Sequence, residues 1–65
     1  MSKKNNLRYM IVDDASAARR KLVRMLSSYS NIELIAQAKN GLEAKVLIET
    51  LKPDLVFLDI EMPHL

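Results

Sequence analysis

Several residue types are missing or scarce in this chain of 65 residues, and their absence excludes whole classes of protein. There is no cysteine, so neither disulfides nor thiolate metal sites can stabilise a core this small. The single glycine, Gly41, lies outside any glycine-rich phosphate-binding motif. No apolar run approaches the roughly 20 residues of a membrane span. The basic start leads into no secretory signal, which predicts a flexible tail over residues 1–6 and a cytoplasmic protein without membrane contact.

The residues that are present indicate one small globular unit. The chain is 49% hydrophobic and 28% charged, with a formal net charge of +2. This net charge is too small to indicate nucleic acid binding by itself. The charge is nevertheless uneven, because residues 1–31 hold seven Lys or Arg and two Asp, whereas residues 32–65 hold three and six acidic residues. The basic half is interpreted mainly as a solvated helix face, with steering of an acidic partner as the alternative.

Hydrophobic periodicity predicts five elements. Three short apolar runs predict strands at about 7–12, 32–38 and 54–58, and the last, apolar throughout, suggests a strand covered on both faces. Between them, spacings of three and four predict amphipathic helices at about 15–28 and 42–51. The first helix has Asp14 or Ser16 as its expected cap, and Pro53 ends the second. The expected apolar stripes are Ala18, Leu22, Met25, Leu26 and Tyr29 on the first helix, and Ala44, Leu47, Ile48 and Leu51 on the second.

The order β-α-β-α-β predicts an α/β fold in which parallel strands are joined by right-handed helical crossovers. Such sheets place ligand sites at the carboxyl ends of their strands. Asp13 and Asp14 follow the first strand and Asp59 follows the third. If these strands are neighbours, the three carboxylates meet, and a hard cation such as Mg²⁺, Mn²⁺ or Ca²⁺ would relieve their repulsion. The plainer alternative is that these residues only cap the following helices.

Three segments carry a resemblance to a known family: residues 10–14 (MIVDD), 39–44 (KNGLEA) and 52–63 (KPDLVFLDIEMP). In this order they resemble the receiver domains of two-component response regulators, of the chemotaxis-regulator type. The resemblance implies a flavodoxin-like doubly wound fold, of which this chain has the N-terminal half, with strand order 2-1-3. It also implies that Asp59 accepts a phosphoryl group from a sensor histidine kinase or phosphotransfer protein. Mg²⁺ would be held by Asp13, Asp14, Asp59 and the backbone carbonyl of Glu61.

The family has two further strands, so residues 7–65 are expected to be a truncated receiver. The Ser or Thr and the Lys that follow those strands in the family have no counterpart here, and phosphorylation is expected to be impaired. The third strand would then be an exposed apolar edge that favours a homo-oligomer or swapped dimer. Nucleic acid would be contacted only by an output domain that this sequence does not contain. The run around Asp59 is similar to receivers of LytTR-type regulators and of chemotaxis methylesterases.

Two alternatives to the phosphoacceptor remain. The chain could be a self-assembling or interaction module with a vestigial acidic site. A Mg²⁺ hydrolase is weaker, because such enzymes have a second Asp two residues after the nucleophile, where Glu61 stands here. The lone His64 is expected to be an exposed loop residue. On the first interpretation the chain is a signalling domain and not an enzyme.

Overall fold

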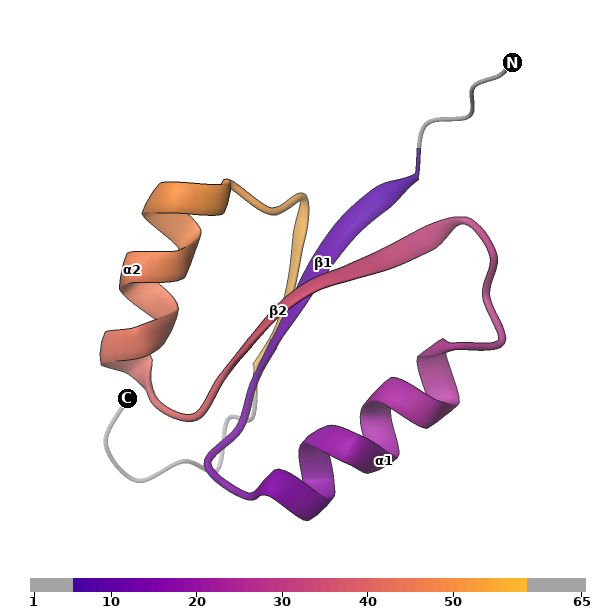
Figure 1. The fold of residues 1–65 in the computed structure, drawn as a ribbon, viewed down its shortest axis with the longest axis horizontal. Helices are drawn as coiled ribbons and strands as arrows, with labels where there is room; N and C mark the ends of the chain where they lie inside the picture. The colour runs from indigo at the N-terminus through magenta and orange to yellow at the C-terminus, as the bar shows by residue number, and fades with distance from the viewer. Residues whose placement is uncertain (1–5, 59–65) are drawn as a thin grey trace.

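The computed structural model describes residues 6–58, which form a three-stranded sheet with one helix on each side (Figure 1). The strands are parallel and lie in the order β2-β1-β3. This confirms the predicted fold class and strand order. The elements in chain order are β1 (Leu7–Val12), α1 (Ser16–Leu26), β2 (Ile32–Ala38), α2 (Gly41–Leu51) and β3 (Leu55–Leu58).

Strand β1 is the centre of the fold. Its last four residues, Tyr9 to Val12, are at most 3% exposed, because β1 has a strand on each side and a helix over each face. A register shift between Tyr9 and Met10 inserts an extra residue, Ile35, into β2. Such a bulge increases the local twist of the strand that contains it.

The face of the sheet under α2 holds a cluster of buried hydrophobic side chains. Met10 and Val12 of β1 contact Ala38 of β2 and Ala44 of α2, and the partly buried Ala36 and Leu47 pack against this cluster. Three of these six side chains are alanines, so the helix approaches the sheet closely. The helix begins at Gly41, one residue before the expected start, and the side chain of Asn40 caps it by accepting a hydrogen bond from the Glu43 N–H at 2.8 Å.

The guanidinium of Arg8 binds the backbone at the connection from α2 to β3. It donates to the backbone carbonyls of Leu51 at 2.7 Å and Lys52 at 3.0 Å, where α2 ends with Lys52 in a left-handed conformation. The Arg8 N–H donates to the Asp54 carboxylate, and the Asp54 N–H donates to the Arg8 carbonyl, both at 2.8 Å. Arg8 therefore satisfies carbonyls that the helix leaves free and aligns the start of β3 beside β1.

The first helix differs from the prediction. It ends at Leu26 rather than near Ser28, and its N-cap is Ala15, without a side-chain cap from Asp14 or Ser16. Met25 and Tyr29 are both 58% exposed, so their assignment to the buried stripe was wrong. The partly buried positions of α1 are Ala18, Arg19, Leu22, Val23 and Leu26. Arg19 and Val23 therefore stand on the inner side of the helix in place of the predicted Met25 and Tyr29.

Two further stretches are more exposed than their sequence patterns suggest, and for the third strand this agrees with the exposed edge expected of a truncated receiver. Ile48 of α2 is 39% exposed although it was placed on the inner stripe. In β3, Leu55, Val56 and Leu58 are 38%, 39% and 49% exposed, so the described part of this strand is not covered on both faces. Strand β3 pairs with β1 alone among the described elements, which leaves its other edge without a neighbour there.

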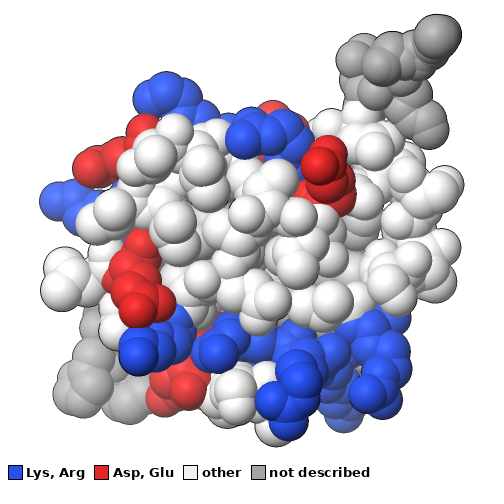
Figure 2. Space-filling view, viewed as in Figure 1, with Lys and Arg blue, Asp and Glu red and all other residues white. Residues whose placement is uncertain are grey.

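The basic residues of α1 occupy one side of the molecule. The helix has four Lys or Arg and no acidic residue, and Lys and Arg side chains gather along this side in Figure 2. The uneven charge found in the sequence is thus concentrated largely on one helix. Neither helix of the described part is long and apolar enough to cross a membrane.

Replacing Arg8 with Ala is expected to lower the free energy of unfolding by about 1–3 kcal/mol, because the helix-end carbonyls lose a charged donor. Arg8→Lys should recover only part of this loss, since an ammonium cannot reproduce the two-pronged contact. Urea unfolding followed by circular dichroism measures the effect. The matched control is Arg20→Ala on the exposed face of α1. Equal stability of Arg8→Ala and Arg20→Ala would contradict this role of Arg8.

Candidate functional site

The carboxyl ends of the three strands lie side by side. Val12, the last residue of β1, is paired with Ala38 of β2 and with Leu58 of β3. The residues that follow the strands therefore leave the sheet from one edge, as the sequence predicted for a ligand site. Asp13 and Asp14 are at this edge. The other predicted site residues, Asp59 and Glu61, and also His64, lie outside the described residues, so their convergence with the acidic pair stays a prediction.

Three hydrogen bonds hold Asp13, one each at its N–H, its carboxylate and its carbonyl. Its N–H donates to the carbonyl of Ala38 at 3.1 Å, which extends the pairing of β1 and β2 by one residue. Its carboxylate Oδ1 accepts from the Ala15 N–H at 3.0 Å, and its carbonyl accepts from Nη1 of Arg19 at 2.7 Å. Asp13 is half-buried, whereas Asp14 beside it is exposed. One carboxylate is thus anchored and the other faces solvent.

Arg19 is a site residue that sequence reasoning missed. Besides contacting Asp13, its Nε donates to Oε1 of Gln37 in β2 at 3.2 Å. Hydrophobic periodicity assigns every arginine of α1 to the polar face, which is why the basic half of the chain was interpreted mainly as a solvated helix face. The one available signal was position: Arg19 precedes Leu22 by three residues and so shares its side of the helix.

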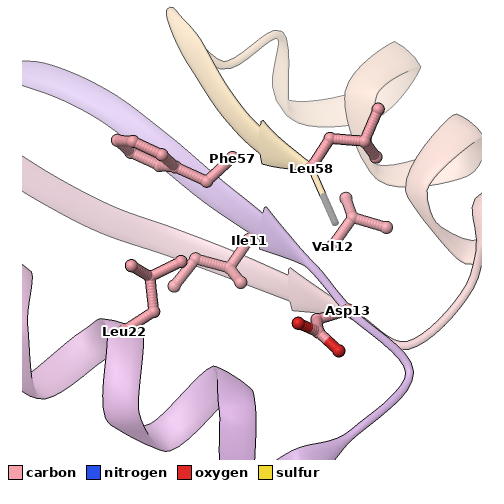
Figure 3. Close-up of a pocket in the computed structure, with 6 residues that line it drawn as sticks. All are labelled: Ile11, Val12, Asp13, Leu22, Phe57 and Leu58. Carbon is pink, nitrogen blue, oxygen red and sulfur yellow. The ribbon is translucent and has the colours of Figure 1, made fainter. Parts of the chain in front are cut away.

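A pocket of about 220 Å³ lies next to Asp13, between α1 and the β1–β3 pair (Figure 3). Leu22 projects from α1 toward Ile11 and Phe57, while Asp13 lies at the end of β1. The ring of Phe57 also meets Tyr9 edge to face, with centroids 5.6 Å apart. The six lining residues are Ile11, Val12, Asp13, Leu22, Phe57 and Leu58. Asp13 is the polar member of this lining, so the acidic edge borders an apolar space.

The chemistry of the acidic pair suits a hard cation. Two adjacent carboxylates supply oxygen ligands, and Mg²⁺ typically takes one or two carboxylates and completes its octahedron with water and phosphate oxygens. Within residues 6–58, no group of three His, Cys, Asp or Glu is placed to hold a metal ion. Of the four predicted ligands, the described part of the chain contains Asp13 and Asp14, so the Mg²⁺ site stays a prediction.

Comparison with known proteins agrees with this geometry. The response regulator receiver domain matches residues 9–65. The chain is 48% identical over 59 residues to an uncharacterized response regulatory protein of Yersinia pestis, covering 91% of this chain and 25% of that protein. It is 47% identical over 58 residues to a protein-glutamate methylesterase/protein-glutamine glutaminase of Lawsonia intracellularis, covering 89% and 16%. A protein of the same name from Bacillus subtilis is 44% identical over 57 residues, covering 88% and 16%.

The chain belongs to the receiver domain family of response regulators, the signalling domains of two-component systems. This confirms the family indicated by the three sequence segments, and the observed sheet is the N-terminal half of the flavodoxin-like fold of that family. The chain spans between about a sixth and a quarter of the length of these curated relatives.

Leu22 is expected to attach α1 to the sheet through this pocket. Leu22→Ala should lower the free energy of unfolding by about 1–3 kcal/mol, below the loss at a fully buried leucine because Leu22 is only half-buried. Met25→Ala on the same helix is the control, and since Met25 is exposed it should change stability by no more than about 0.5 kcal/mol. Both are measured by urea unfolding. A larger loss for Met25→Ala than for Leu22→Ala would contradict the observed orientation of α1.

Proposed function

We propose that this receiver chain is a phosphoacceptor, in which Asp59 takes a phosphoryl group from a sensor histidine kinase or phosphotransfer protein in the cytoplasm. Mg²⁺ would be held by Asp13, Asp14, Asp59 and the backbone carbonyl of Glu61. The observation that carries the proposal is the pairing of Val12 with Leu58. These two residues directly precede Asp13 and Asp59 in the sequence, on neighbouring parallel strands.

The proposed step is a transfer between two nucleophiles. A carboxylate oxygen of Asp59 attacks the phosphorus of a phosphohistidine and the P–N bond breaks. The histidine nitrogen leaves with the electron pair of that bond and takes up a proton from water, which gives neutral imidazole. The product is an aspartyl phosphate on the chain itself, so the domain acts as a signalling substrate rather than as an enzyme on other molecules. A Mg²⁺ ion held by these residues would neutralise charge on the transferring group. The described residues contribute the anchored carboxylate of Asp13 and the exposed carboxylate of Asp14.

Phosphorylation of the 65-residue chain by itself is expected to be slow. In the family, a Ser or Thr and a Lys that follow the fourth and fifth strands contact the phosphoryl oxygens. Lys39, Lys45 and Lys52 are in other segments and do not replace them. The phosphoryl group would therefore have fewer hydrogen-bond donors in this chain, and removing one such preorganised donor costs about 10²–10³ in rate in a well-studied protease.

Incubation with acetyl phosphate and Mg²⁺ is expected to add the mass of one phosphoryl group to the chain, as measured by intact-mass spectrometry. The added mass should disappear when Mg²⁺ is chelated and in Asp59→Asn, which removes the attacking carboxylate. Glu49→Gln, the same kind of change at an exposed position of α2, is the control and should be modified like the parent chain. Modification that persists in Asp59→Asn would contradict the assignment of the acceptor.

The exposed side chains of β3 favour a second candidate, the self-assembling module. Leu55, Val56 and Leu58 are all more than one-third exposed, and the described part of the chain pairs β3 on one edge only. An unpaired apolar edge strand is a template for a strand of another molecule. We propose that two copies associate through this edge, either side by side or by exchanging elements in a swapped dimer.

Size-exclusion chromatography with light scattering is expected to show a dimer or larger assembly of the 65-residue chain. Val56→Lys should shift it toward monomer, because a charge on an edge strand opposes pairing. Val46→Lys places the same charge at an exposed position of α2 and should leave the assembly unchanged. A cooperatively melting monomer at all concentrations would rule out assembly through β3.

A further inference from the structure

We infer that Arg19 is a positioning residue of the acidic site, which holds the Asp13–Asp14 segment in the conformation that binds Mg²⁺. The inference rests on the proposed function and assigns a residue of α1 to it. Arg19 donates to the Asp13 carbonyl at 2.7 Å and to the Gln37 amide oxygen at 3.2 Å. It thereby connects α1, the end of β1 and β2.

The acidic pair needs such an anchor because it lies beyond the sheet. Residues 13–15 form irregular backbone between β1 and α1, and pairing with β2 reaches only as far as the Asp13 N–H. The peptide group after Asp13 leads directly to Asp14, and the carbonyl of that group is the acceptor of the Arg19 bond. Arg19 therefore sets the plane of the peptide that joins the two carboxylate residues.

The chemistry of these contacts leaves the carboxylates available to a cation. Both acceptors of the Arg19 bonds are neutral oxygens, one of a peptide carbonyl and one of a side-chain amide. A guanidinium bonded to carboxylates would compete with the metal, whereas these bonds orient the backbone. A planar guanidinium also presents donors in a fixed geometry, so one side chain reaches both acceptors.

The neighbouring arginine provides a matched comparison. Arg20 has the same charge on the same helix, but its side chain is exposed, whereas Arg19 is half-buried against the sheet edge. A general effect of positive charge near the site would be similar for both. A positioning effect would be confined to Arg19 and, more weakly, to its second acceptor, Gln37.

The test measures the Mg²⁺ dissociation constant of the 65-residue chain and its variants by titration of amide NMR shifts, at a temperature where each is folded. Arg19→Gln is expected to raise the dissociation constant about tenfold, the lower end of the effect of removing a residue that orients a metal ligand. Arg19→Lys should recover part of the affinity. Arg20→Gln should stay within about twofold of the parent chain.

Hydrogen exchange without metal gives an independent readout. In Arg19→Gln, the Ala15 amide, which donates to Asp13 Oδ1, should exchange faster, while the Ala44 amide in α2 should not change. A uniform acceleration at both amides would show a merely structural role and overturn the inference. If Arg19→Gln does not fold, Gln37→Ala decides: an increase in the Mg²⁺ dissociation constant of a few fold supports positioning, and no increase overturns it.

The two proposals fail in different ways. If the parent chain binds no Mg²⁺, the proposed metal site falls, and the role of Arg19 in it falls as well. If the parent chain binds Mg²⁺ and a folded Arg19→Gln binds it equally well, only the inference about Arg19 falls. The same holds if Arg20→Gln loses as much affinity as Arg19→Gln.

Discussion

The parallel pairing of β1 with a strand on each side is the constraint on which the rest of this structure depends. Because β1 ends in register with both neighbours, at Ala38 and at Leu58, the segments after the strands all leave from one edge. The same central position explains the burial of β1, since no other described element has neighbours on both edges and both faces. A change of register or strand order would separate the acidic pair from the end of β3.

Two arginines secure the ends of this apolar strand by the same chemistry. Arg8, near the start of β1, donates to carbonyls at the end of α2, and Arg19 donates to the carbonyl just after β1. The apolar side chains of β1 form no hydrogen bonds, so the free carbonyls near its ends need polar side chains as donors. In both cases a guanidinium satisfies carbonyls that lie outside the regular hydrogen bonding of helix and sheet. The ends of β1 are thus held by side chains that hydrophobic patterning assigns to solvent.

The acidic site combines a rigid and an accessible part. Asp13 has its N–H, carbonyl and one carboxylate oxygen engaged, whereas Asp14 is exposed to solvent. This division suits the proposed site, which would bind a small cation and admit a phosphoryl donor, because a fixed ligand sets the geometry and an open side allows approach. Because the chain belongs to the receiver family, this edge of the sheet is where we place the proposed phosphoacceptor site.

The sequence by itself determined the family, the five elements and the parallel order, and it placed the acidic pair at the carboxyl edge of the sheet, where the structure has it. These follow from local patterns: strand-length apolar runs, helical spacing, and carboxylates directly after strands. Only the tertiary structure decided which side of α1 packs against the sheet, the inward role of Arg19 and the exposure of Met25, Ile48 and β3. Burial depends on which other elements cover a side chain, and a polar side chain can turn inward when it meets unpaired carbonyls. Neither condition is contained in the local pattern of a single segment.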